Sequence, residues 1–163
     1  MDPVRASELL DVIREDHELV AEHLRTLVEL EAIASLADEQ HLERSLMLFH
    51  EVSRFIHTKL LPHFESEEGG FFLLLREFLP RGSTLVYELE SEHEQLRELC
   101  GRLCSEIELL RHQKHRRTAL FQELQQICGR IAELLRQHAE REDALVQSYI
   151  KAMPQMDLHT VTS

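Results

Sequence analysis

The chain has 163 residues and a formal net charge of −12 with histidine counted as neutral. This length predicts one domain with a core large enough to fold without disulfides. The acidic charge argues against a nucleic-acid-binding or membrane-surface protein, and no apolar run approaches the roughly 20 residues that a membrane span needs. With 5 glycines, 4 prolines and no tryptophan, the composition favours helices over a sheet.

The cysteines and the first residues predict the cellular compartment. Three cysteines are an odd number in a chain of this length, which favours reduced thiols over disulfides. The first residues, Met1-Asp2-Pro3, do not have the character of a signal peptide. We therefore expect a cytoplasmic protein.

Apolar residues recur at helical spacing in four long segments. The first segment covers about residues 7–34, the second about 39–78, the third about 83–112 and the fourth about 118–149. Short connections between long helices predict an all-α, antiparallel, up-down-up-down four-helix bundle. We expect this bundle to occupy residues 1–153 and the last residues, 154–163, to form a loose tail.

Prolines and glycines mark where these helices bend or end. Pro62 lies inside the second helix and should bend it or remove one backbone hydrogen bond, and Gly69-Gly70 should loosen it again. Pro80-Arg81-Gly82-Ser83 is the clearest turn in the chain, and Ser83 is the expected N-cap of the third helix. A basic stretch before the fourth helix is expected to be the last loop.

Histidines and carboxylates form a pattern that occurs once in each half of the chain, which has 11 histidines in all. Each half has one histidine between acidic residues, and then a His-x-x-x-Glu pair about 45 residues later. The residues are His17 followed by His63 and Glu67, and His93 followed by His138 and Glu142. This repeat predicts a helical hairpin that is used twice.

The register of an antiparallel bundle predicts that these residues meet. Two residues on neighbouring helices lie at one level when the loop is midway between them. The first His-x-x-x-Glu pair is centred near residue 65, so its midpoint with His17 is about 41 and its midpoint with His93 is about 79. The second pair is centred near residue 140, which gives a midpoint with His93 of about 116. All three midpoints fall near a predicted loop, so all six residues should share one layer of the core.

The residue types in this layer predict a metal site. A histidine and a glutamate four residues apart lie on one helix face, so a ring nitrogen and a carboxylate can reach the same metal. Two such pairs supply two carboxylates that could bridge two metal ions, with two of the four histidines on each. Imidazole and carboxylate suit iron, and also manganese or zinc. The alternative is a buried polar network without metal, which must offset the cost of burying two carboxylates.

These motifs resemble the hemerythrin-like, HHE cation-binding family over about residues 8–150. The resemblance implies an antiparallel four-helix bundle that holds an oxo- or hydroxo-bridged di-iron centre. It implies terminal ligands at His17, His63, His93 and His138, and bridging ligands at Glu67 and Glu142.

One departure from the oxygen-carrying hemerythrins bears on function. Those proteins have a His-x-x-x-His pair on the third helix, whereas Leu89 and Arg97 stand four residues on either side of His93 here. The four-His, two-Glu set is more similar to the di-iron domain of the repair-of-iron-centres proteins. With this set each iron would have room for an external ligand, which favours reaction with oxygen, peroxide or nitric oxide, or release of iron, over reversible oxygen carriage.

Several functions and partners stay open from the residues. The leading hypothesis is a di-iron protein that binds or processes a small diatomic or peroxide ligand, with or without turnover. The alternatives are an iron store, sensor or donor that meets an iron-acceptor protein, and a metal-free interaction bundle. The apolar run Leu73-Leu74-Leu75 could extend to a homodimer surface. A ferritin-like site needs a second Glu-x-x-His motif besides Glu90 and His93, and the sequence has none on the other ligand histidines.

The remaining candidate residues have less specific roles. Glu90 could be a further ligand, and Tyr87 or Tyr149 could donate a proton or an electron. We expect aromatic side chains to line the site and exclude water from it: Phe64, Phe71, Phe72 and Tyr149. The cysteines are expected to pack in the core: Cys100, Cys104 and Cys128.

Overall fold

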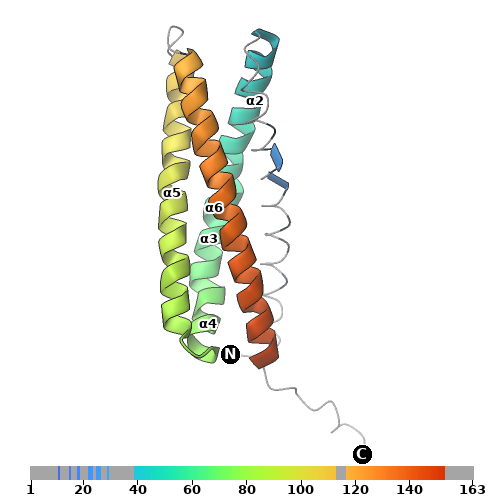
Figure 1. The fold of residues 1–163 in the computed structure, drawn as a ribbon, viewed down its shortest axis with the longest axis vertical. Coiled ribbons are helices and arrows are strands. Elements are labelled where there is room, and N and C mark those ends of the chain that lie inside the picture. Colours follow the sequence, from blue (N-terminus) through green and yellow to red (C-terminus); the bar gives the residue numbers. More distant parts are fainter. Residues whose placement is uncertain are drawn as a thin grey trace, which may run out of the picture.

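The structure is a computed structural model that describes residues 39–112 and 117–152, together with scattered positions between 11 and 29. The described residues are helical apart from a short turn at 79–81, and they contain no strand. The predicted all-helical bundle is confirmed, with three of its long helical segments described (Figure 1). His17 and the tail after residue 153 lie outside the described residues.

The second predicted helix is one long rod made of α-helical and π-helical parts. It consists of α2 (Glu39–Phe55), η1 (Ile56–Leu60), α3 (Leu61–Ser66), η2 (Glu67–Phe71) and α4 (Phe72–Phe78). The other two rods are α5 (Gly82–His112) and α6 (Arg117–Ala152). These bounds agree with the predicted helices to within a few residues. In Figure 1, α5 and α6 run side by side along their length, next to the rod of α2, α3 and α4.

Two π turns lie where the sequence predicts a bend or a lost hydrogen bond at Pro62 and a loosening at Gly69-Gly70. In the first, the N–H of Leu61 donates to the carbonyl of Ile56, five residues earlier. Pro62 then follows within the first turn of α3, where its missing N–H costs least. The second π turn contains Gly69-Gly70, as the expected loosening predicts, and it begins at Glu67. Such turns hold one extra residue per turn and are frequent at functional sites.

A tight turn joins α4 to α5 and sets their register. Arg81 has a positive φ of 61°, and its carbonyl accepts hydrogen bonds from the N–H groups of Thr84 and Leu85. The prediction that Ser83 caps the helix is wrong, because α5 begins one residue earlier, at Gly82. A Cβ atom on Gly82 would lie 1.9 Å from the carbonyl oxygen of Leu75. Glycine is therefore required at this position, where the backbone of α5 packs directly against that of α4.

The core that the described residues form has two apolar clusters with a polar layer between them. The larger cluster lies between α2–α3 and the facing parts of α5 and α6, and it includes Phe49, Leu103 and Ile131. The smaller one, which includes Leu74 and Val86, lies at the end of the bundle near the α4–α5 turn. Among the described residues, the buried polar side chains other than Ser45 all belong to this layer: His63, Glu67, His93, His138 and Glu142.

Three other features of the sequence have a clear place in the fold. Leu74 and Leu75 are buried in the smaller apolar cluster, so Leu73 alone of that apolar run is exposed. Cys100 and Cys128 are buried in the larger cluster, and Cys104 packs against it. None of the described helices is long and apolar enough to cross a membrane.

Candidate metal centre

Three rods contribute the side chains of the polar layer. His63 lies in α3 and Glu67 opens η2, one helical turn further on. His93 comes from α5, and His138 and Glu142 lie four residues apart on α6. All five are buried, and the carboxylates of Glu67 and Glu142 are 0% exposed. The structure thus brings together every predicted ligand that it describes, while His17 lies outside the described residues.

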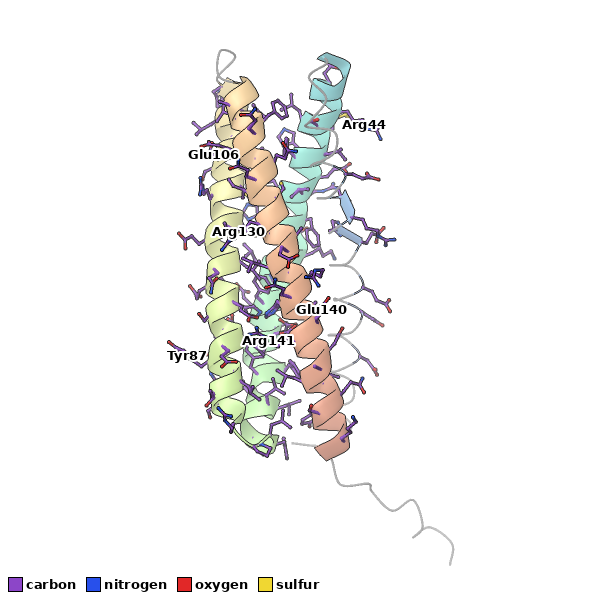
Figure 2. The ribbon with its side chains drawn as sticks, viewed as in Figure 1. Arg44, Tyr87, Glu106, Arg130, Glu140 and Arg141 are labelled. Carbon is purple, nitrogen blue, oxygen red and sulfur yellow. The ribbon has the colours of Figure 1, made fainter. Side chains whose placement is uncertain are left out.

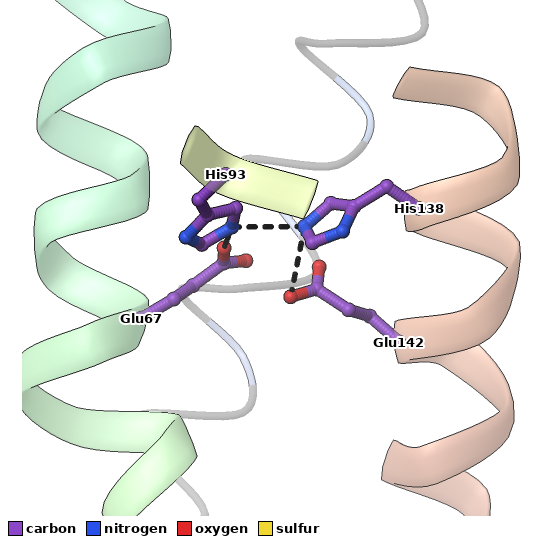
Figure 3. A group of neighbouring side chains, drawn as sticks. All are labelled: Glu67, His93, His138 and Glu142. Atoms are coloured by element: carbon purple, nitrogen blue, oxygen red, sulfur yellow. Dashed lines mark hydrogen bonds and ion pairs between the residues drawn. The ribbon is translucent and has the colours of Figure 1, made fainter. Parts of the chain in front are cut away.

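Four of these residues point their ligand atoms at one another (Figure 3). One nitrogen or oxygen from each of Glu67, His93, His138 and Glu142 lies within 4.8 Å of those of the others. The Nε2 atoms of the two histidines are 2.9 Å apart. A carboxylate oxygen flanks each of them, because Glu67 Oε2 lies 3.2 Å from the Nε2 of His93 and Glu142 Oε1 lies 3.2 Å from that of His138. We call these four residues the central cluster.

His63 extends the central cluster by one side chain. Its Nε2 lies 2.7 Å from Glu67 Oε1, whereas the other oxygen of Glu67 faces His93. The carboxylate of Glu67 therefore stands between two histidines from different helices. This contact follows from the four-residue spacing, which places both side chains on the same helix face.

The ring nitrogens on the far side of the two central histidines are also paired with carboxylates. His93 Nδ1 lies 2.7 Å from Glu68 Oε1, and His138 Nδ1 lies 2.8 Å from Glu92 Oε2. A carboxylate accepts hydrogen bonds, so each Nδ1 donates. The Nε2 atoms are consequently the ones presented to the central cluster.

Aromatic rings enclose His93. Phe64 stacks on one side with ring centroids 4.1 Å apart, and Phe72 stacks with a separation of 5.2 Å. Phe64 also presents an edge to His138 at 6.2 Å. Phe71 contacts Phe72, but Tyr149 lies farther along the bundle, where it packs against Phe78. The predicted aromatic lining therefore centres on Phe64 and Phe72.

The carboxylates dominate the electrostatics of the layer. Burial by itself would lower the pKa of His138, but hydrogen bonds with Glu142, Glu67 and Glu92 outweigh it and hold that pKa well above its ordinary value. Burial would raise the pKa of Glu92, yet the hydrogen bond from His138 and the charge of Arg141 hold it below its ordinary value. The layer thus favours positive charge at its centre.

Other candidate residues lie away from the central cluster. Glu90 pairs with Arg76 at 2.7 Å and does not join the cluster. Tyr87 is 73% exposed and points out from α5 (Figure 2). Among the remaining histidines with described side chains, His57 is exposed, His50 is half-buried, and His23 stacks on Phe55.

Sequence reasoning did not assign the arginines that reach this site. Arg97 donates to Glu68, and Arg141 contacts Glu92. The available signal was their spacing, because Arg97 follows His93 by four residues and Arg141 follows His138 by three. Both arginines therefore lie one turn along the helix from a predicted ligand.

Comparison with known protein families agrees with this geometry. A model of the hemerythrin HHE cation-binding domain matches residues 8–150. The chain belongs to this family. Searches of curated proteins and of solved structures found no match.

The central cluster of this hemerythrin-like chain could hold a metal ion. Two fully buried carboxylates require a compensating positive charge, since an isolated buried carboxylate is strongly unfavourable. Two imidazole Nε2 atoms that face each other at 2.9 Å also need a cation or a proton between them. Imidazole and carboxylate ligands fit iron, manganese or zinc, so the donor set suits the family's cation.

Proposed function

We propose that this protein is a hemerythrin-like, non-haem di-iron protein that binds or processes oxygen, peroxide or nitric oxide. The observation that carries the proposal is the buried central cluster, in which two carboxylates and two imidazoles from three rods converge. Glu67 and Glu142 would hold both irons, and His93 and His138 would bind through Nε2. His63 would add a ligand beside Glu67, and His17 would add one from the first predicted helix. A pair of iron ions supplies the redox chemistry that reaction with these small molecules needs.

The surroundings of the central cluster favour a small ligand. His93 stacks against both Phe64 and Phe72, and neither phenyl ring has any exposed surface. A drug-sized organic substrate would need a large pocket lined by several side chains. A diatomic molecule or a peroxide needs only a short path between packed side chains. The phenyl rings would also exclude water and protect the centre from hydrolytic loss of metal.

The direct test is reaction of the iron-loaded protein with each small molecule. Metal-free protein is loaded anaerobically with ferrous iron and then exposed separately to oxygen, hydrogen peroxide and nitric oxide. We expect a change in the visible and near-ultraviolet spectrum with at least one of them, which is absent in a His93→Ala variant. Repeated consumption of the ligand would indicate an enzyme, and a single stoichiometric reaction would indicate a binding protein. No change with any of the three would contradict the proposal.

Iron donation is the second candidate. Glu68 and Glu92 are partly exposed carboxylates that lie beside His93 and His138. They stand between the central cluster and solvent, so the cluster is only one side chain from the surface. This candidate predicts stoichiometric transfer of iron to an apo iron–sulfur protein. Incubation of the iron-loaded protein with such an acceptor, followed by separation and metal analysis of each, distinguishes it from ligand processing.

A further inference from the structure

The two central histidines are held from behind in the same way. The Nδ1 of His93 donates to Glu68, which comes from η2, and the Nδ1 of His138 donates to Glu92, which comes from α5. In both cases the carboxylate lies on the rod that precedes its histidine in the chain. Each contact therefore crosses from one rod to the next at the level of the central cluster.

An arginine completes each of these contacts. Glu68 accepts two hydrogen bonds from Nη2 of Arg97, at 2.8 and 3.0 Å. Glu92 uses one oxygen for His138 and the other for Nη1 of Arg141 (labelled in Figure 2). The carboxylates are half-buried, with 29% and 19% of their side chains exposed. We call Glu68 with Arg97, and Glu92 with Arg141, the anchor pairs.

We propose that the anchor pairs are positioning residues for the metal centre, which fix both central histidines with Nδ1 protonated and Nε2 aimed at the metal. This inference rests on the proposed function. An ionised carboxylate can only accept a hydrogen bond, so it selects the imidazole tautomer that carries its proton on Nδ1. An arginine remains charged at any relevant pH, so its ion pair holds the carboxylate in place beside the histidine. A carboxylate behind a ligand histidine also makes that histidine a stronger donor to metal.

The anchor pairs also limit the motion of the two rings. A histidine ring can turn about its last side-chain bond unless both of its edges are held. Arg97 lies over the ring of Phe64, with its guanidinium carbon 5.7 Å from the ring centre, and Phe64 stacks on His93. One arginine thus supports His93 both through Glu68 and through an aromatic neighbour. We expect the ring to be oriented for metal before any metal binds.

The chain offers a matched control for these contacts. Arg76 and Glu90 form an ion pair of 2.7 Å that joins α4 to α5, close in length to the contacts of the anchor pairs. It is about one-third exposed, and no histidine contact involves either residue among those that the structure describes. Glu90 lies outside the central cluster, so Glu90→Gln removes a similar bond between rods without changing that cluster or the anchor pairs.

The experiment compares Glu68→Gln, Glu92→Gln and Glu90→Gln with the wild type. Each full-length protein is loaded with zinc, which is diamagnetic and suits the same ligands, and then mixed with a colorimetric chelator. We expect zinc loss to be about 10–100-fold faster from the first two variants and unchanged in the control. Melting of the metal-free proteins should shift equally little in all three. Equal zinc loss from all three variants would overturn the inference.

A second measurement does not depend on variants that fold. Nitrogen-15 NMR of the zinc-loaded wild-type protein reports which ring nitrogen carries the proton. We expect protonated Nδ1 and metal-bound Nε2 for both His93 and His138. Zinc bound through Nδ1 of either ring would overturn the inference and leave the metal centre standing. Failure of the wild type to take up zinc or ferrous iron would instead overturn the proposed function, and the inference with it.

Discussion

Glu67 and Glu142 decide the chemistry of this protein at the scale of single residues. Both carboxylates are 0% exposed, and each lies beside a histidine nitrogen of the central cluster. A buried carboxylate is tolerated only when positive charge and hydrogen bonds replace its hydration. In the metal-free protein a proton on His138 supplies part of that charge, and a metal cation would displace this proton.

Replacing Glu142 with glutamine keeps the shape of the side chain but removes its charge. We expect Glu142→Gln to retain about half of the wild-type metal or less, because a neutral amide is a weak metal ligand. The melting temperature of its metal-free form should also fall, because Glu142 pairs with His138 and removal of one partner of a buried pair is destabilising. Metal analysis and circular dichroism measure both effects. Glu140→Gln, at an exposed position of the same helix, is the control, and full metal content in Glu142→Gln would contradict this role.

The reactivity of the Cys100 thiol, which lies outside the polar layer, should depend on pH in a predictable way. Burial raises the pKa of its thiol to about 12, and the nearby Cys104 adds to the shift. The thiolate is the reactive form, so a raised pKa suppresses reaction at neutral pH. We expect alkylation of Cys100 by iodoacetamide in the folded protein to stay slow between pH 7 and 10, as followed by mass spectrometry of its peptide. A rise in rate with a midpoint near pH 9 would contradict a protected thiol.

The residues of the central cluster could be predicted from the sequence at this scale, but the arginines that complete the anchor pairs could not. Histidine and glutamate at helical spacing on an apolar helix face indicate a metal site, because few other roles place such residues there. Arg97 and Arg141 gave no such signal, since arginine is ordinary on an exposed helix surface. Their roles depend on which carboxylate of a neighbouring rod faces them, and a single sequence does not specify that pairing.

At the scale of elements, a π turn and one glycine position the residues of the polar layer. The π turn η2 starts at Glu67 and carries Glu68, which faces His93 on the neighbouring rod. The insertion of one residue changes the direction of all later side chains by about 100°. The α4–α5 turn then fixes how far His93 lies along its helix. A change in the geometry of η2 or of the α4–α5 turn would therefore separate Glu68 from His93.

Two glycines of α5 test the importance of that turn. Gly82→Ala would bring a Cβ atom to 1.9 Å from the carbonyl oxygen of Leu75, whereas Gly101→Ala would meet nothing within 4 Å. We expect the first change to lower the free energy of unfolding by about 1–3 kcal/mol, through overpacking. The second should raise it by about 0.5–1 kcal/mol, because alanine is the better helix former. Urea denaturation measures both, and equal effects would contradict the close approach at Gly82.

The extents of the helices could be predicted where local sequence preferences alone determine them. The long apolar periodicities gave the extents of the described helices to within a few residues, and Pro80-Arg81-Gly82-Ser83 marked the turn. The start of α5 was missed by one residue, because serine is the usual cap but close packing against Leu75 decides this position. The π turn before Pro62 was also missed, since proline predicts a lost hydrogen bond but not how the helix will accommodate it.

At the scale of the whole molecule, the described residues form a polar layer between two apolar clusters. Three rods supply that layer in the part of the chain that the structure describes, so binding of metal would tie these rods together. The register of the bundle followed from loop positions, which is why the meeting of distant residues could be predicted. The metal identity and the ligand could not, because the same imidazole and carboxylate set suits several metals.

Metal should stabilise the folded bundle. A ligand that binds only the native state at a concentration 100 times its dissociation constant adds about 2.7 kcal/mol, which corresponds to about 5–10 °C in melting temperature for a chain of this size. We expect the melting temperature to fall by about this amount when a chelator removes the metal, and to recover when metal is restored. Differential scanning calorimetry makes the measurement, and an unchanged transition would favour the metal-free alternative.

The decisive measurement for a di-iron centre is metal content by mass spectrometry, on protein purified without an affinity tag. We expect about two iron ions per chain in the wild type and loss of iron in a Glu67→Ala, His93→Ala double variant. Wild-type protein that contains no metal, and that takes up no ferrous iron under anaerobic conditions, would contradict this expectation. The polar layer would then be a metal-free network in the core of a helical bundle.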